Sequence, residues 1–297
     1  MTIIDLPVSK PSLARRIFDN RLVRFFALFI ITIAAYAGAQ ILPAAALPRI
    51  AVENREMAAI VFEAVSAIGL LLIYWLCVRW MEHRPVSELS LRRAPLAIPA
   101  GALIGTGLFT ITIAILSLMG VAHVGAFNSG QPLLAAINMA ILSAIGEEIV
   151  FRGVVFRIFE EMFGTFIALL VSAGFFGLIH MGNHGATVVS GVAIALEAGL
   201  LLAVSYAVVR NLWLPIGLHF GWNFAESGIF GSVVSGKAFT GLFATTMTGP
   251  EVLTGGTFGP EASVVAVAVC AAAAAAILII AVRRGEWWGL RFAINAK

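Results

Sequence analysis

Long apolar segments alternate with short polar stretches along the whole chain. Eight of these segments approach the ~20 residues that an α-helix needs to cross a bilayer. Backbone groups in lipid must pair with one another, and no ten-residue alternating pattern indicates a β-barrel. The pattern therefore predicts an all-α polytopic membrane protein with about eight transmembrane helices, at 23–43, 58–78, 96–119, 133–157, 165–181, 186–209, 212–230 and 262–282.

The composition agrees with a membrane protein. Of the 297 residues, 60% are hydrophobic and 12% are charged, whereas soluble domains carry about 25% charge. The first apolar segment is too long for a signal-peptide core of 7–15 residues, so we expect an uncleaved anchor. The Ala-rich chain with short loops favours a multi-pass protein of a bacterial plasma (inner) membrane.

The basic residues indicate the orientation. With the N-terminus inside, 16 of the 19 Lys and Arg residues fall on cytoplasmic segments, and only Arg49, Arg55 and Lys237 fall outside. This asymmetry predicts an N-in, C-in topology. Basic residues of this kind mark topology and contact membrane lipids, so the pI near 9.2 requires no nucleic-acid partner.

The predicted helices divide the chain into three parts. These are a cytoplasmic arm at 1–22, a helical domain at 23–284 and a cytoplasmic tail at 285–297. Residues 231–260 form the longest connection, on the outer side. A solvated linker is the simpler interpretation of this loop, and a lid over a cavity is the alternative.

The sequence GEEIVFRG, at 146–153, places three charges inside the fourth predicted helix, where charges are costly. Glu148 and Arg152 are four residues apart and can pair on one helix face, which favours a structural role. Glu147 points ~100° away from Glu148 around the helix. It lacks that partner, so it is a candidate general base.

His180 lies near the end of the fifth predicted helix. If the turn between the fourth and fifth helices is at Gly164, Glu147 and His180 are 17 and 16 residues from it. Both then lie ~25 Å from the turn, at matching depth. A core histidine with one hydrogen bond is the simpler interpretation, but the matching depth favours a pair. His184 is expected in a loop.

The seventh predicted helix carries His219 and Asn223, four residues apart on one face. Hydrogen bonding between helices is the simpler interpretation, and donors for an oxyanion are the functional one. Gly217 and Gly221 allow close helix packing. Two further acids, Glu197 and Glu226, could face a cavity and receive no role.

Three motifs follow one another on the predicted core helices within 133–230. They are EExxxR at 147–152, FxxxH at Phe176–His180 and HxxxN at His219–Asn223. The set resembles the CAAX prenyl protease and bacteriocin-processing (CPBP, or Abi) family of intramembrane proteases. The resemblance implies an intramembrane endopeptidase acting on membrane-associated or lipidated protein or peptide substrates. It also implies that Glu147 and His180 activate the water, His219 and Asn223 stabilise the oxyanion, and Glu148 and Arg152 support the site.

The need for a metal is open. Glu147, His180 and His219 could form a two-histidine, one-carboxylate zinc site, although the chain has no HExxH motif. We favour metal-independent catalysis, with no certain cofactor and a divalent metal such as zinc as the alternative.

Two other functions remain open: a transporter or proton relay, and a non-catalytic immunity or scaffold protein of the same fold. Intramembrane Glu and His also occur in transport pathways. However, the internal repeats and broken helices typical of transporters are not evident. For a protease, Arg152 and Arg157 on the inner stretch of the fourth helix predict a cavity that opens toward the cytoplasm.

Overall fold

The computed structural model describes residues 17–49, 55–129 and 133–284. Most of the predicted arm and the whole predicted tail lie outside the described residues. All eight predicted segments are helical. The helices are α2 (Arg21–Ala46), α3 (Arg55–Met81), α4 (Ala94–Leu118), α5 (Leu134–Glu148), α6 (Arg157–Phe163), α7 (Thr165–His180), α8 (Val188–Ile194), α9 (Leu200–Val209), α10 (Trp213–Phe224), α11 (Glu251–Thr254) and α12 (Val264–Arg283).

Three π-helical segments extend these helices: η4 (Ile149–Phe156), η5 (Ala195–Gly199) and η6 (Ala225–Ile229). Segment η4 joins α5 to α6, η5 joins α8 to α9, and η6 follows α10. Short 3₁₀ turns occur at Leu47–Arg49, Ser87–Leu89 and Pro260–Ala262. In the described chain, six helices are long and apolar enough to cross a membrane, whereas α7 has only 16 residues. The chain is thus an all-α, multi-pass membrane protein, and the count of eight spans stays a prediction.

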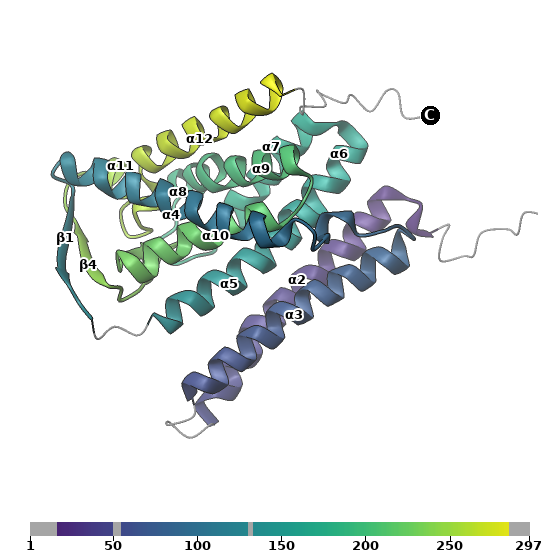
Figure 1. Ribbon diagram of the computed structural model, residues 1–297, viewed down its shortest axis with the longest axis horizontal. Coiled ribbons are helices and arrows are strands. Elements are labelled where there is room, and N and C mark those ends of the chain that lie inside the picture. Colours follow the sequence, from purple (N-terminus) through teal and green to yellow (C-terminus); the bar gives the residue numbers. More distant parts are fainter. Residues whose placement is uncertain (1–16, 50–54, 130–132, 285–297) are drawn as a thin grey trace, which may run out of the picture.

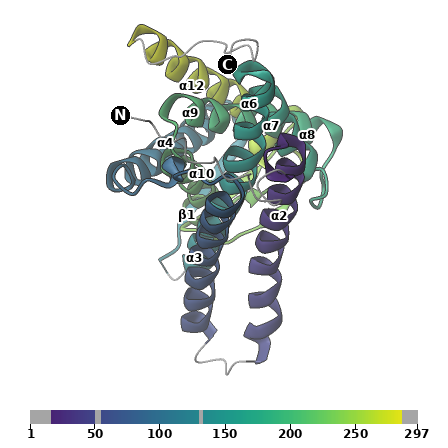
Figure 2. The same cartoon turned by 90° about the vertical axis from the view of Figure 1, so that its right-hand side faces the viewer.

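The helices form a bundle from which one hairpin projects (Figures 1 and 2). This hairpin is α2 with α3, and its tip lies away from the other helices. Two small sheets stand at one end of the bundle. In them β1 (Ala122–Phe127) pairs with β4 (Phe243–Met247), and β2 (Val233–Val234) pairs with β3 (Lys237–Ala238), both antiparallel. We call this the strand end, and the opposite end, where α2 begins and α3 ends, the Arg-rich end.

Helices α4 and α10 pack through glycines on both sides of their contact. A methyl group on Gly105 would collide with the backbone of Leu218, and one on Gly221 would collide with the backbone of Ala102. Gly217 likewise lies against Ile98. The prediction that the α10 glycines allow close packing is confirmed. The contact fixes the position of α10, which carries two candidate site residues.

Four charged residues form ion pairs at the Arg-rich end, and we call them the charge cluster: Glu82, Arg84, Glu88 and Arg157. Arg157 donates to both carboxylate oxygens of Glu82, at 2.8 and 2.5 Å. Arg84 donates to both oxygens of Glu88, at 2.9 and 2.7 Å. Burial raises the pKa of Glu82 and Glu88, but the arginines outweigh it and hold both pKa values below the usual range. The cluster ties the loop after α3 to α6.

Candidate active site

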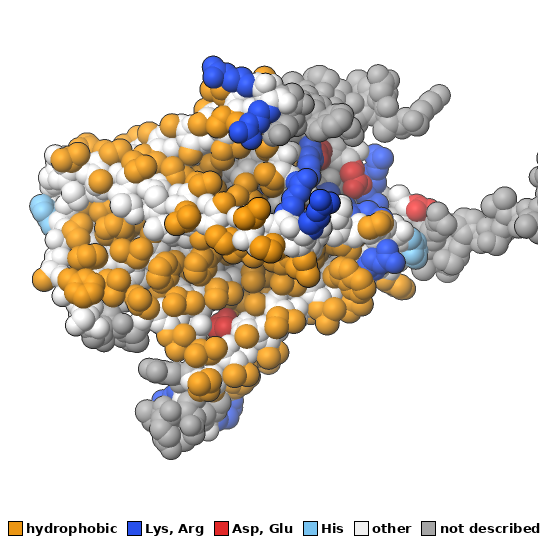
Figure 3. All heavy atoms as spheres, viewed as in Figure 1, with side chains coloured by type: hydrophobic (Ala, Val, Ile, Leu, Met, Phe, Trp, Pro, Cys, Tyr) orange, Lys and Arg blue, Asp and Glu red, His pale blue; other side chains and the backbone are white. Residues whose placement is uncertain are grey.

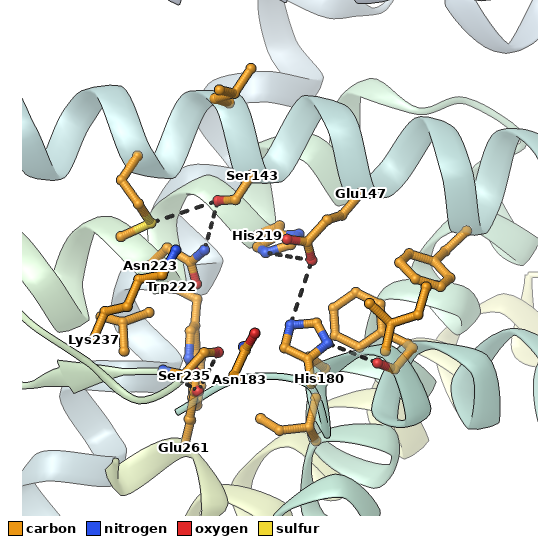
Figure 4. A pocket seen from close by; sticks show the side chains of 18 of the residues that line it. Ser143, Glu147, His180, Asn183, His219, Trp222, Asn223, Ser235, Lys237 and Glu261 are labelled. Atoms are coloured by element: carbon orange, nitrogen blue, oxygen red, sulfur yellow. Dashed lines mark hydrogen bonds and ion pairs between the residues drawn. The ribbon is translucent and has the colours of Figure 1, made fainter. Parts of the chain in front are cut away.

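The bundle contains a cavity of about 590 Å³, within the usual range for ligand sites. Its lining comes from α2, α3, α5, η4, α7 and the turn after it, the α8–α9 helix, α10 and the segment 233–261. The four predicted catalytic residues, Glu147, His180, His219 and Asn223, all line it (Figure 4). The fold therefore brings these side chains together from three separate helices.

Glu147 lies between the two imidazoles. Its Oε2 atom is 3.8 Å from Nε2 of His180 and 3.9 Å from Nε2 of His219 (Figure 4). Its Oε1 atom accepts a hydrogen bond of 3.1 Å from the hydroxyl of Tyr36. The sequence analysis missed Tyr36, because nothing in the spacing of α2 relates it to α5. The expected depth match between Glu147 and His180 holds, although π-helical η4 intervenes before the turn at Gly164.

His180 is held by the residue one turn before it. Its Nδ1 atom donates to the carbonyl oxygen of Phe176 at 2.7 Å, so Nδ1 carries a proton. In the neutral ring, Nε2 is then an acceptor that faces Glu147. The ring also stacks on Phe176, with centroids 4.6 Å apart. This explains the FxxxH spacing. His184 lies in an exposed turn, as expected.

Glu148 and Arg152 form the predicted pair, and both side chains are fully buried. Oε1 of Glu148 accepts from Arg152 at 2.8 Å and lies 3.0 Å from Nδ1 of His219. Arg152 also donates to the carbonyl oxygens of Ala198 and Gly199, at 3.2 and 2.9 Å. Both carbonyls belong to η5, and π-helical segments often occur beside functional sites. The pair thus links α5, η5 and α10 behind the site.

A residue of α5 also orients the side chain of Asn223. Its side-chain amide donates to the hydroxyl of Ser143 at 3.0 Å (Figure 4). The sequence analysis missed Ser143, although its position four residues before Glu147 places it on the same helix face. That spacing could have identified it.

Four further carboxyl groups lie at or near the cavity. Glu63, Glu197 and Glu261 line it, and Glu226 is buried but is not among the lining residues. The thiol of Cys270 donates to Glu197 at 3.4 Å. Glu261 accepts two hydrogen bonds of 2.6 Å from the backbone and hydroxyl of Ser235, while burial raises the pKa of its carboxyl.

The segment 231–260 is folded and contributes to the cavity. Its strands β2 and β3 bring Ser235, Lys237 and Phe239 to the cavity wall. The segment is thus more than a solvated linker, and its action as a lid stays a prediction. Neither Arg152 nor Arg157 is among the described lining residues, and the opening of the cavity toward the cytoplasm stays a prediction. Both are taken up by ion pairs, and the lining extends to the strand end.

Metal binding can be tested against the same geometry. Within the described ranges, no group of three or more His, Cys, Asp and Glu side chains is arranged to hold a metal ion. The trio of Glu147, His180 and His219 is not such a group as it is placed. No step of the reaction below is derived through one.

The comparisons with known proteins bear on the three motifs. Residues 129–225 match the family model described as "Type II CAAX prenyl endopeptidase Rce1-like". This segment is similar to the domain that defines that family. It contains all three motifs, so the resemblance to the CAAX protease family is confirmed over this range. Searches of curated proteins and of solved structures found no significant match. At family level, the Rce1-like domain is that of an intramembrane endopeptidase with protein or peptide substrates.

Proposed function

We propose that the chain hydrolyses peptide bonds of membrane-associated or lipidated substrates with a water activated by Glu147 and His180. The supporting observation is that Glu147 Oε2 faces the Nε2 atoms of both imidazoles at 3.8 and 3.9 Å inside the cavity. Polar atoms at this separation suit a bridging water rather than a direct hydrogen bond. The water donates one proton toward Glu147 and the other toward Nε2 of His180, which leaves a lone pair for attack.

In the reaction, one proton passes from the water to Glu147 and then from Glu147 to the leaving amine. Glu147 takes a proton from the water as its oxygen bonds to the peptide carbonyl carbon, and the carbonyl oxygen becomes an oxyanion. When the carbon–nitrogen bond breaks, Glu147 returns the proton to the leaving amine. The products are a carboxyl group and an amine, and Glu147 is again a carboxylate.

His219 and Asn223 face the developing oxyanion. Asn223 retains a second amide proton beyond the one donated to Ser143. His219 donates through Nε2 when both ring nitrogens are protonated, and the Glu148 carboxylate at Nδ1 stabilises that form. Donors held in advance at the site of developing charge are the largest contribution in many acyl-transfer enzymes.

The test compares two matched substitutions in purified, membrane-reconstituted protein. Glu147→Gln keeps an oxygen for the Tyr36 hydrogen bond but cannot take a proton, whereas Glu251→Gln makes the same change at an exposed position on α11. Each variant is incubated with a membrane proteome, and new protein termini are mapped. We expect termini with the wild type and Glu251→Gln and none with Glu147→Gln. Unchanged cleavage by Glu147→Gln and by His180→Ala would refute the assignment.

Repeating the experiment with a chelator distinguishes metal-independent from metal-dependent hydrolysis. A metal-independent reaction continues in the presence of a strong chelator. Loss of cleavage that zinc restores would instead show a metal-dependent enzyme. Proton flux that depends on Glu147, without any peptide cut, would support the relay alternative.

A further inference from the structure

The cavity wall carries more acidic than basic side chains. Four of the chain's 16 Asp and Glu residues line the cavity, namely Glu63, Glu147, Glu197 and Glu261. Lys237 is the only lysine or arginine among the described lining residues, and it is exposed. On the face of the molecule in Figure 3, by contrast, hydrophobic side chains cover the helices and the charged ones gather mainly near one end. The cavity is thus a local concentration of carboxyl groups in a largely apolar molecule.

Glu197, on η5, has one carboxyl oxygen without a partner. Its Oε1 atom accepts from the thiol of Cys270 at 3.4 Å, whereas its Oε2 atom has no hydrogen-bond partner among the described residues. The residue is only 2% exposed, so bulk water does not supply a donor. A buried acceptor that lacks a donor is costly. This oxygen therefore calls for a donor that enters the cavity from outside the described chain.

Glu261 and Glu226 add two further carboxyl groups beside Glu197. The carboxyl groups of Glu261 and Glu226 hydrogen-bond to each other, so one of the two must hold a proton. Neither oxygen of Glu226 has a donor elsewhere in the described chain, and Glu261 accepts from the backbone and hydroxyl of Ser235. Glu197 interacts electrostatically with Glu261. None of these hydrogen-bond partners is a base, so the acidic group lacks a cation.

This acidic group shares the cavity with the candidate catalytic residues. Figure 4 shows Glu261 and Ser235 on the side of the cavity opposite Glu147. Glu261 also interacts electrostatically with His180, whose ring is neutral in the proposed mechanism. A peptide whose carbonyl group lies at Glu147 can therefore extend a neighbouring side chain toward Glu197 and Glu261.

The lining next to Glu197 is apolar. Ile194, Ala198 and Leu201 belong to the same continuous α8–η5–α9 helix and also line the cavity. Lys and Arg combine an apolar stem with a charged end, which carries three donors in Lys and five in Arg. Such a side chain can pack its methylene groups against the apolar lining and bring its donors to the carboxyl oxygens. An apolar or acidic side chain would leave those oxygens without a donor.

We propose that Glu197 and Glu261 form a subsite for a Lys or Arg side chain of the substrate, close to the bond that is cut. That this bond is cut rests on the proposed function, whereas binding of the basic side chain does not. Without substrate, a shared proton limits the repulsion between the carboxyl groups, and the bound cation takes over that role. Both residues contact a substrate side chain away from the reacting atoms, so they determine specificity.

Binding is tested without cleavage, on Glu147→Gln protein in an uncharged detergent. The probe is a library of short random-sequence peptides with blocked termini, so that only side chains carry charge. Bound peptides are identified by mass spectrometry, and we expect Lys and Arg to be enriched over the input. Adding Glu197→Gln or Glu261→Gln should remove the enrichment, whereas adding Glu251→Gln, at an exposed position on α11, should leave it unchanged. Absence of enrichment, or equal enrichment in all four proteins, overturns the proposal.

A second measurement ties the basic side chain to the subsite. In the most enriched peptide, the basic residue is replaced by norleucine, which keeps the stem and removes the charge. We expect binding to Glu147→Gln protein to weaken about tenfold, as for one lost hydrogen bond to a charged group. When Glu197→Gln is also present, the same replacement should have little effect, because the contact is already gone. An unchanged tenfold effect in that protein would place the basic side chain elsewhere. The norleucine comparison itself needs no substitution in the subsite, so it stands even if Glu197→Gln does not fold.

The same preference should appear in cleavage by the wild type. Glu147-dependent termini in a membrane proteome should have Lys or Arg enriched beside the cut, and Glu261→Gln should raise KM for those substrates more than it lowers kcat. Termini without a basic bias would overturn the subsite while leaving the proposed function intact. Basic peptides that bind through Glu197, without any Glu147-dependent terminus, would instead refute the proposed function and retain the subsite.

Discussion

The hydroxyl of Tyr36 donates a 3.1 Å hydrogen bond to Oε1 of Glu147, across 111 positions of sequence. The tyrosine ring lies against Gly146, where a methyl group would collide with it. The hydrogen bond holds Oε1, and so Oε2 is the oxygen that faces His180 and His219. Tyr36 is thus a positioning residue for the proposed general base.

Tyr36→Phe should lower kcat about tenfold with little change in KM. The variant loses one hydrogen bond to a carboxylate, worth about 1.5–3 kcal/mol, and part of that loss falls on the transition state. Steady-state kinetics on a cleaved substrate measure kcat and KM separately. As a comparison, Tyr74→Phe should mainly lower the thermal midpoint, because the Tyr74 hydroxyl lies 2.6 Å from Glu88 in the charge cluster. Equal effects of both variants on kcat would argue against a positioning role.

Arg152→Met should destabilise the protein by about 3–5 kcal/mol, since it leaves the buried Glu148 carboxylate without its partner. Adding Glu148→Gln should restore part of that stability, because the unpaired charge is then gone. Thermal unfolding in detergent compares the three forms. Activity should stay low in the double variant, as His219 has lost the carboxylate at Nδ1. Full recovery of cleavage would contradict the proposed role of His219.

Asn223→Ala should reduce kcat by about 10²–10³-fold, the usual loss when one oxyanion donor is removed. Ser143→Ala should have a smaller effect, since it removes only the group that orients the Asn223 amide. Both variants should keep the thermal midpoint of the wild type within a few degrees. A larger loss of kcat in Ser143→Ala than in Asn223→Ala would assign the direct role to the serine.

Gly105→Ala should lower both stability and activity, whereas Gly107→Ala on the same helix should not. A methyl group at 105 meets the backbone of Leu218, next to His219, and one at 107 meets nothing within 4 Å. The Gly107 variant should gain up to about 1 kcal/mol from helix propensity. Thermal unfolding and cleavage assays of the two variants test whether the α4–α10 contact positions the site.

The stability of the Arg-rich end should fall at acidic pH. Burial raises the pKa of Glu82 and Glu88, but their arginine partners lower both values below the ordinary glutamate pKa. A carboxylate with a lowered folded-state pKa stabilises the protein above its unfolded pKa, and this stabilisation is lost as the pH falls through the folded value. We expect the thermal midpoint to drop below about pH 4.3. Glu82→Gln should flatten that dependence, and Glu251→Gln should not.

The sequence by itself determined the positions of the long helices and the membrane class, but it predicted neither the two strand pairs nor the π-helical segments. An apolar run of ~20 residues has few alternatives to a helix in lipid, because its backbone must bond internally. Local spacing also predicted the Glu148–Arg152 pair, and turn counting predicted that Glu147 and His180 lie at one depth. These relations depend on helix geometry alone, which is the same in every protein.

Only the tertiary structure decided which side chains complete the site. Tyr36 comes from a distant helix, and its hydroxyl finds Glu147 through packing that no local spacing encodes. Arg157 was predicted to mark the opening of a cavity, but it forms an ion pair with Glu82 and does not line the cavity. The sequence shows that a charged residue lies within a membrane helix, where it is costly. Which residue pairs with it depends on how the helices pack together.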